Sequence, residues 1–93
     1  MTYQFKEEAN RMVALDGKGK EAGEVKFTRQ DRNVLSIDHT EVNDEFRGQG
    51  LGGRIIEQVV EKAKKEDLKI MPVCSYAKKQ FAEHEEYQPY MQN

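Results

Sequence analysis

The segment with the clearest chemical potential is a run of glycines near the middle of the sequence. Residues 47–53 read Arg-Gly-Gln-Gly-Leu-Gly-Gly, and apolar residues at helical spacing follow them directly. Glycines let a backbone pass close to a ligand, and the free N–H groups at a helix N-terminus lie at the positive end of the helix dipole. A turn without a ligand needs only one or two glycines. The segment therefore predicts a phosphate-binding cradle, to which Arg47 can add a charge-assisted hydrogen bond.

Two common phosphate-binding motifs do not fit this segment. Gly48, Gly50 and Gly53 match the dinucleotide pattern G-x-G-x-x-G, but a chain of 93 residues has no room for the two βαβαβ halves of that fold. The acidic residue expected at the end of the second strand is also missing, because that strand ends in Cys74. No Lys-Ser/Thr pair follows the glycines, so the Walker pattern fails as well. The spacing predicts a phosphate and leaves the ligand open.

The elements that must position the cradle begin with an antiparallel meander of three strands. An apolar stretch at residues 11–16 precedes a Gly-Lys-Gly turn, and residues 21–29 alternate between apolar and polar side chains. After a turn at residues 31–33, residues 34–42 form the third predicted strand.

The apolar phase of this third strand slips. Leu35, Ile37 and His39 share one parity, but the next apolar residues are Val42 and Phe46. A slip of one residue in a pattern of period two indicates either a β-bulge or a strand that ends earlier, near residue 40. Both alternatives remain open at this point.

The second half changes to helical periodicity. Residues 51–63 carry an apolar stripe, and lysines follow in the last turn, where positive charge suits the helix dipole. Residues 68–74 form a short apolar strand, Ser75 is the expected N-cap of a second helix over residues 76–85, and Pro89 ends regular structure. The predicted order is βββαβα, an α/β (α+β) fold whose last strand runs parallel to the third.

Length and composition fit one small domain over residues 1–93. The 15 basic and 17 acidic residues leave a net charge of −2, which argues against nucleic acid as the main partner. The longest apolar run, residues 70–74, is far shorter than the roughly 18 residues of a membrane span, and residues 1–8 lack the apolar core of a signal peptide. A single cysteine cannot form an internal disulfide, so we expect a cytoplasmic protein with a free thiol. We also expect no bound metal.

The glycine motif and three further short segments together resemble the GNAT superfamily of N-acetyltransferases. The acetyl-CoA motif of that family, Q/R-x-x-G-x-G/A, is matched position for position by residues 47–52. A subfamily of very small, stand-alone GNAT-like proteins also has a His-Thr pair before the motif, a Pro-x-Cys-Ser-Tyr segment after the next strand and a His-x-x-Tyr ending. This chain has the three segments at residues 39–40, 72–76 and 84–87, and the resemblance covers roughly residues 10–90.

The resemblance implies a minimal GNAT-like fold in which coenzyme A lies in a V-shaped opening between two splayed parallel strands. The pyrophosphate would bind the backbone amides of residues 48–53, and the pantetheine arm would pair with the backbone at the end of the third strand. Side chains that follow the second parallel strand would flank the other side of the cofactor. The expected cofactor-binding residues are Val42, Asn43, Arg47, Gly48, Gln49, Gly50, Leu51, Gly52, Gly53, Ser75, Tyr76 and Lys79.

The resemblance also makes Cys74 and His39 candidate catalytic residues. Cys74 could accept the acetyl group or give a proton to the departing thiolate, and the alternative is a small buried hydrophobe. His39 is in phase with Leu35 and Ile37, so it is either a core histidine or, across from Cys74, a base or thiol activator. Tyr76 is an alternative proton donor or a wall of the cofactor groove.

The function implied is acetyl transfer from acetyl-CoA to an amine on a small molecule or a protein. Ordinary GNAT enzymes are longer, and the parts that usually shape the acceptor pocket are absent from this sequence. Acetyl-CoA therefore carries over from the resemblance better than any acceptor does. The alternative function is a module that binds or senses CoA or acyl-CoA with little catalysis.

Overall fold

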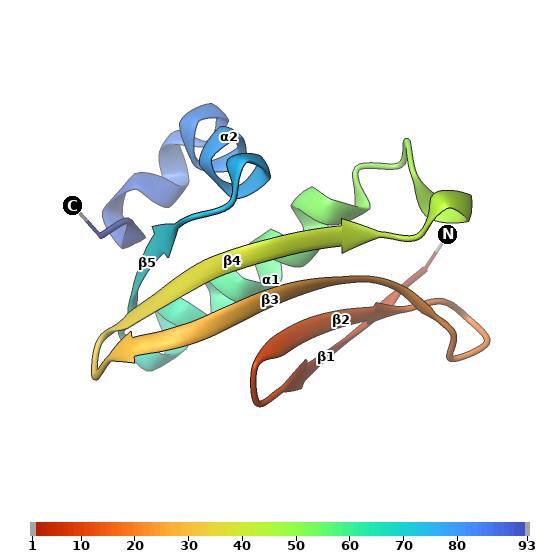
Figure 1. Cartoon of the computed structure of the whole chain (residues 1–93), viewed down its shortest axis with the longest axis horizontal. Helices are drawn as coiled ribbons and strands as arrows, with labels where there is room; N and C mark the ends of the chain where they lie inside the picture. Colours follow the sequence, from red (N-terminus) through yellow and green to blue (C-terminus); the bar gives the residue numbers. More distant parts are fainter. Residues whose placement is uncertain (1, 93) are drawn as a thin grey trace.

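A five-stranded sheet with one long helix across its face forms the body of the molecule (Figure 1). The structure, a computed structural model, describes residues 2–92, so both ends of the domain expected over residues 1–93 lie outside the described residues. The elements in chain order are β1 (Gln4–Glu8), β2 (Arg11–Leu15), β3 (Glu21–Asp31), β4 (Val34–Val42), the 3-10 helix η1 (Asp44–Phe46), α1 (Leu51–Glu66), β5 (Lys69–Pro72), α2 (Ser75–Glu83) and the 3-10 helix η2 (Glu85–Tyr90).

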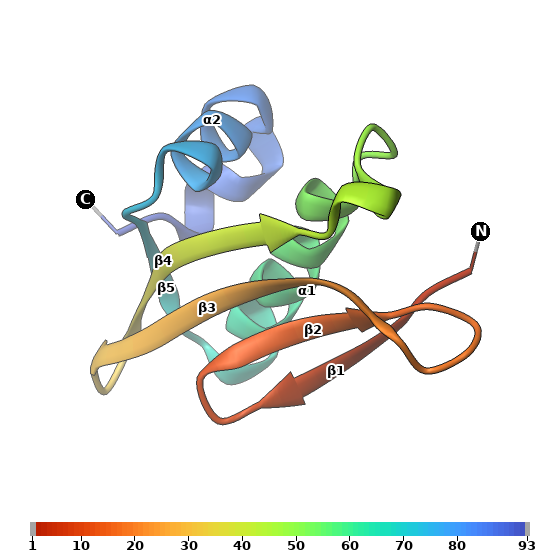
Figure 2. The ribbon, with the colours of Figure 1, turned by 45° about the vertical axis from the view of Figure 1, so that its right-hand side comes forward.

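The strands lie in the order of the sequence. Strands β1 to β4 are antiparallel neighbours, and β5 pairs with β4 in parallel. Because a parallel pair needs a crossover, α1 connects β4 to β5 and covers one face of the sheet. The meander, the α-β-α order and the parallel final strand predicted from the sequence are confirmed. Figure 2 shows that the loop before α1 and helix α2 both rise above β4.

The helical stripe of α1 forms the centre of the core. Its buried residues pack against inward-facing side chains of the central strands, and Phe81 from α2 and Tyr87 from η2 close the end of the core beside β5. The stripe consists of Leu51, Ile55, Ile56, Val59, Val60 and Ala63. This packing fixes where α1 begins, and therefore where its N-terminal amides point.

Strand β1 was not predicted from the sequence. It pairs with β2 over five residues, from Gln4 opposite Leu15 to Glu8 opposite Arg11. Most of its side chains are charged or polar, and only Phe5 packs against the core. No apolar alternation was therefore available to indicate a strand.

Two further expectations about the second half are wrong. The 3-10 helix η2 continues through Pro89, where regular structure was expected to end. Strand β5 stops at Pro72, earlier than expected, because the N–H groups of Val73 and Cys74 both donate to the carbonyl of Ile37, at 3.0 and 3.1 Å. The chain then turns away from β4 into α2.

A β-bulge interrupts β4, which decides between the two alternatives for this strand. Lys26 pairs with His39 and Phe27 with Ile37, so Asp38 has no partner on β3. Beyond the bulge the strand continues to Val42. Because one extra residue reverses the alternation, Thr40 takes the core face of its buried partner Val25, whereas His39 turns to the open face beside Lys26.

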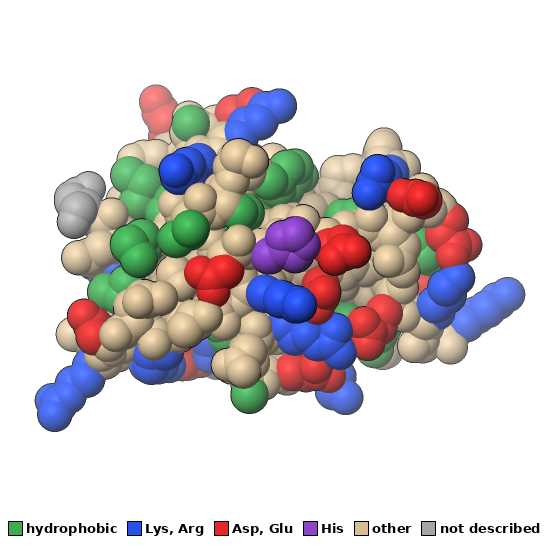
Figure 3. All heavy atoms as spheres, viewed as in Figure 1, with side chains coloured by type: hydrophobic (Ala, Val, Ile, Leu, Met, Phe, Trp, Pro, Cys, Tyr) green, Lys and Arg blue, Asp and Glu red, His purple; other side chains and the backbone are tan. Residues whose placement is uncertain are grey.

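The open face of the sheet is charged. Figure 3 shows basic and acidic side chains intermingled over it. At its β2 end, Arg11 donates hydrogen bonds to Glu21, Glu8 and Glu24, which raise the pKa of Arg11, and the bond from Arg11 lowers the pKa of Glu21. Within residues 2–92, no helix has both the length and the apolar character needed to cross a membrane.

Candidate functional site

A groove opens where β4 and β5 part. The two strands pair only from Val34 opposite Lys69 to Ile37 opposite Pro72, so the rest of β4 has a backbone edge without a strand partner among residues 2–92. The groove has a volume of about 620 Å³ and runs from this edge to the N-terminus of α1. It is lined by His39, Thr40, Glu41, Val42, Phe46, Arg47, Gly48, Gly50, Leu51, Gly52 and Tyr76.

Most of the expected cofactor-binding residues lie in this groove, and five of them do not line it. Asn43 is turned toward β3, where its N–H donates to the carbonyl of Ala22. The side chain of Gln49 is bound by Tyr3, and Gly53 lies against Gln80 of α2. Ser75 and Lys79 are exposed on α2, outside the groove.

The first turn of α1 presents free backbone donors to the groove. Gly50 is the N-cap, and the first helical hydrogen bond runs from the N–H of Arg54 to the carbonyl of Gly50. The N–H groups of residues 51–53 therefore have no helical carbonyl partner, and the N-cap residue, Gly50, has no side chain with which to cap them. With no acidic residue in the first turn, the positive end of the helix dipole is left for an external anion.

Glycine is required at the four positions of the cradle for two different structural reasons. Gly48 and Gly50 have φ values of +82° and +72°, a conformation that other residues adopt only at a cost, and the space beside them is open. Gly52 and Gly53 are helical, and an added Cβ would lie 2.9 Å from the Tyr76 ring and 3.0 Å from Gln80 Oε1. The second pair lets α2 approach α1, a reason that the sequence did not indicate.

Arg47 lies at the rim of the groove and is already bound on one side. Its Nε donates to the carbonyl of Val42 at 3.2 Å and lies 3.3 Å from Asp44 Oδ1. The side chain is 68% exposed. An anion at the start of α1 could therefore reach its guanidinium.

Cys74 lies where β4 and β5 diverge. Its Sγ is 3.5 Å from Thr40 Oγ1 and accepts a hydrogen bond from the N–H of Ala77 at 3.4 Å. Cys74, and not Ser75, is therefore the N-cap of α2, which corrects the expected cap by one residue. The side chain is half-buried and packs against the edge of the core.

The inward position predicted for His39 is wrong. Its side chain is 56% exposed and its Nε2 lies 3.4 Å from Glu41 Oε2, on the face opposite to Thr40. The cause is the bulge at Asp38, which places Thr40 in the position beside Cys74 that was expected for His39. His39 still lines the groove at its edge.

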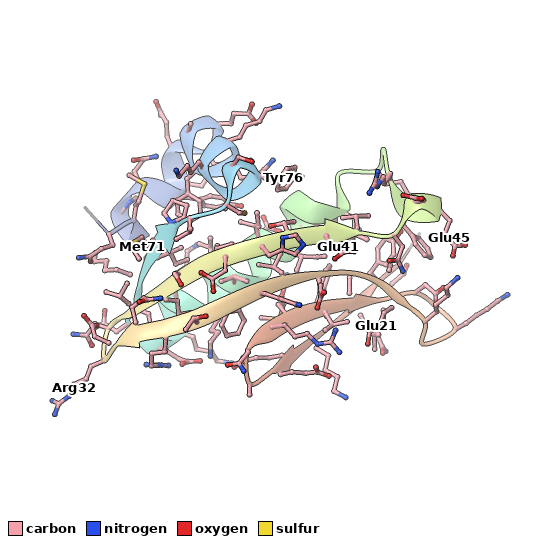
Figure 4. All side chains as sticks on the ribbon, viewed as in Figure 1. Glu21, Arg32, Glu41, Glu45, Met71 and Tyr76 are labelled. Atoms are coloured by element: carbon pink, nitrogen blue, oxygen red, sulfur yellow. The ribbon has the colours of Figure 1, made fainter. Side chains whose placement is uncertain are left out.

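Tyr76 forms the wall of the groove on the side of α2. Figure 4 shows its side chain reaching from the start of α2 toward α1. It also lines a smaller groove of about 270 Å³ between the two helices. That smaller groove is completed by Gly50, Gly53, Arg54, Glu57, Gln80, His84 and Tyr87.

Sequence reasoning missed three residues that line the groove, Thr40, Glu41 and Phe46, and one residue, Tyr3, that contacts the glycine segment from outside the groove. Thr40 stood in the His-Thr pair, but only the position of the bulge shows that it meets Cys74. Tyr3 donates a hydrogen bond from its hydroxyl to Gln49 Oε1 at 2.7 Å, across 46 positions of the chain. No local pattern indicates such a contact.

Comparisons with known proteins agree with this geometry. The family model described as GCN5-related N-acetyl-transferase matches residues 11–90. A GCN5-like protein from Staphylococcus aureus is 33% identical, with 97% of this chain and 88% of that chain covered and a TM-score of 0.78. No curated protein matched the sequence.

Two larger solved structures share the fold. One is a GNAT family acetyltransferase from Elizabethkingia anophelis with acetyl-CoA bound, at 22% identity and a TM-score of 0.63, with 83% of this chain and 51% of that chain covered. The other is a GNAT family N-acetyltransferase from Escherichia coli in complex with CoA, at 18% identity and a TM-score of 0.63, with 83% and 43% covered. This chain thus spans about half the length of these two proteins. Since the family model accounts for residues 11–90 of 93, the chain belongs to the GCN5-related N-acetyltransferase family.

Proposed function

We propose that this chain binds acetyl-CoA in the groove between β4, α1 and α2 and transfers the acetyl group to an amine. The observation that carries the proposal is the continuity of the groove, which joins the unpaired edge of β4 to the free amides of α1. An extended thioester and an anion can bind side by side in such a site. The neighbours crystallised with acetyl-CoA and CoA support this choice of cosubstrate.

The cofactor's pyrophosphate would accept hydrogen bonds from the N–H groups near residues 48–53. Arg47 would add its charge after exchanging its bond to the Val42 carbonyl for one to phosphate. That exchange would free the carbonyl for an amide of the pantetheine arm, which would lie along β4 like an added strand. The backbone N–H of Asn43 already donates to the carbonyl of Ala22, so Asn43 would contribute less directly than expected to binding the pantetheine arm.

The proposed reaction is direct transfer. The amine nitrogen forms a bond to the acetyl carbon, the carbon–sulfur bond of the thioester breaks, and the departing sulfur receives a proton. A site that holds amine and thioester together makes this step effectively unimolecular without a covalent relay. Cys74 is the proposed proton donor to the departing thiolate: it does not itself line the groove, but its Sγ lies 3.5 Å from Oγ1 of Thr40, which does, at the divergence of β4 and β5.

His39 keeps a different proposed role. Because it lies on the open face and does not face Cys74, it does not activate the thiol. From the edge of the groove it is placed to take the proton that the amine loses, with Glu41 beside it to stabilise the imidazolium. The acceptor would then approach from the open face of the sheet. The proposed compartment is the cytoplasm, since a lone thiol suits a reducing environment.

A nuclear magnetic resonance titration with acetyl-CoA tests binding and site together. We expect amide signals of residues 40–42 and 48–53 to shift, and signals of β1–β2 turn residues to stay. Turnover is then measured with two acceptor classes, small-molecule amines and lysine-containing peptides, by following the release of the CoA thiol. No shift at millimolar acetyl-CoA, or binding without transfer to either class, would contradict the proposal.

A further inference from the structure

Tyr3 connects the N-terminal segment to the glycine loop, residues 47–50, which leads into α1 and forms part of the phosphate cradle. Its hydroxyl donates to Gln49 Oε1 at 2.7 Å, its ring meets that of Phe46 edge-on at a centroid distance of 6.1 Å, and the Arg54 guanidinium lies 5.4 Å from its ring centroid. These three partners stand before, within and after the glycine loop. A single buried side chain, 7% exposed, thus contacts the centre of the loop and both of its flanks.

The glycine loop has few other restraints. Gln49 lies between Gly48 and Gly50, the two residues with positive φ, and glycines lose more conformational freedom on ordering than other residues do. Within the described part of the chain, the hydrogen bond from Tyr3 is the one side-chain hydrogen bond that residues 48–50 make. It holds the loop at its centre.

Arg54 is also held in an unusual position. It lies in the first turn of α1, where positive charge opposes the helix dipole. Its guanidinium is placed over the rings of Tyr3 and Phe5, at 5.4 and 5.5 Å from their centroids. The N-terminal segment therefore fixes both the loop and the charge beside it.

We infer that Tyr3 is a positioning residue of the cofactor site: by holding Gln49 it keeps the amides of the glycine loop in the arrangement that binds the pyrophosphate. The inference rests on the proposed function. Tyr3 and β1 precede residues 11–90, the part matched by the family model, so the inference extends the site to a segment outside that match. A loop ordered before binding costs less to order on binding, and its loss appears as weaker apparent affinity.

The test compares Tyr3→Phe, Gln49→Ala and the double variant with the wild-type chain. Phenylalanine keeps the ring contacts and removes only the hydroxyl. We expect each single variant to raise the dissociation constant of CoA roughly 3- to 10-fold, the range of one hydrogen bond, and the double variant to add nothing further. In turnover assays KM for acetyl-CoA should rise while kcat is kept, which a general loss of structure would not produce.

Tyr90→Phe is the matched control. Tyr90 is a partly buried tyrosine at the opposite end of the molecule, packed against Lys64, and its hydroxyl should not affect CoA binding. If wild-type protein binds CoA and Tyr3→Phe binds equally well, the inference is overturned and the proposed function stands. If wild-type protein fails to bind CoA, the proposed function falls and takes the inference with it.

Two further outcomes decide the mechanism of the effect. Independent, multiplying losses of affinity in the double variant would overturn the inference, because the two side chains would then act separately. If Tyr3→Phe does not fold, Gln49→Ala tests the same bond from an exposed residue, and unchanged affinity in that variant would overturn the inference equally.

Discussion

At the scale of single residues, the divergence of β4 and β5 is occupied by a sulfur–hydroxyl contact rather than by a pair of charged groups. Cys74 Sγ lies 3.5 Å from Thr40 Oγ1 and also caps α2 through the N–H of Ala77. Sulfur is a weak acceptor, and serine and aspartate are much commoner at an N-cap. A residue that is second-best for the helix is expected where the thiol itself serves the chemistry.

The first prediction separates these two tasks of Cys74. Cys74→Ser should keep or raise stability, because serine is a preferred N-cap, and should lower turnover, because the hydroxyl is a weaker proton donor than the thiol. Cys74→Ala should lower both, with about 0.5–1 kcal/mol lost from the cap. Denaturant unfolding gives the first quantity and CoA release the second. Full turnover in Cys74→Ser would remove the thiol from the proposed mechanism.

The second prediction contrasts the two kinds of glycine. Gly52→Ala adds a Cβ 2.9 Å from the Tyr76 ring, so this exposed ring must swing aside, while the helix gains about 0.5–1 kcal/mol in propensity. We expect nearly unchanged stability, shifted Tyr76 ring signals and weaker CoA binding. Gly50→Ala meets no neighbour but is strained by its φ of +72°, which costs about 1–2 kcal/mol.

Unfolding curves and CoA titrations on the two variants check this contrast. Gly50→Ala should leave the Tyr76 signals unchanged and lose stability, whereas Gly52→Ala should do the reverse. Identical behaviour of the two variants would show that the glycines share one role.

His39 shows how far residue placement can be predicted from the sequence. The slip in apolar phase between His39 and Val42 was visible and allowed a bulge there, whereas the structure has the extra residue earlier, at Asp38. Since a shift of one residue exchanges the two faces of a strand, a bulge after His39 assigns the position beside Cys74 to His39, and a bulge at Asp38 assigns it to Thr40. Pairing with β3, a tertiary property, makes the choice.

At the scale of elements, periodicity was sufficient wherever an element buries one face. Strands β2 to β4 and helix α1 each carry an apolar pattern that packs against the core, and all four were predicted. Strand β1 lies at the sheet edge and contributes Phe5 alone to the core, so its sequence carries no such pattern. The contact of Tyr3, the residue before β1, with Gln49 could not be predicted either, because no apolar pattern marks this segment.

The third prediction concerns the turn between β2 and β3. Asp16 Oδ1 accepts hydrogen bonds from the N–H groups of Lys20 and Lys18, at 2.9 and 2.8 Å, and these bonds lower the pKa of Asp16. A folded-state pKa below the unfolded value favours folding when the group is ionised. This stabilisation is present above the unfolded pKa and is lost as the pH falls through the folded pKa.

Asp16→Asn should therefore be less stable than the wild type at neutral pH, and the difference should shrink on acidification. Denaturant unfolding of both proteins from pH 7 to pH 3 measures it. Asp31→Asn is a matched control in the next turn, where the carboxylate accepts one backbone hydrogen bond, from Asn33, and we expect a smaller effect there. A stability difference that does not change with pH would exclude the ionised turn as its source.

At the scale of the whole molecule, the groove lies along the part of β4 that β5 does not cover. Most of the interior lies between α1 and the sheet, and beyond Ile37 the edge of β4 has no strand beside it in the described part of the chain. A chain of 93 residues buries a smaller share of its surface than a larger domain does. The architecture was predictable because one helix and one sheet admit few arrangements, whereas the depth and lining of the groove depend on where β5 stops.

The last prediction follows from this thin core. A ligand in the groove would contact the β4 edge, the glycine loop and Tyr76 of α2 together, and so would link three parts of the fold. CoA at 100 times its dissociation constant should stabilise the folded state by roughly 2.7 kcal/mol. For a domain of this size, that corresponds to a rise in Tm of roughly 10–20 °C, measurable by calorimetry or by circular dichroism. Adenosine, which lacks the pyrophosphate and the pantetheine arm, should give no comparable rise. An equal rise with adenosine would place the binding energy outside the groove, and no rise with CoA would contradict the site as a whole.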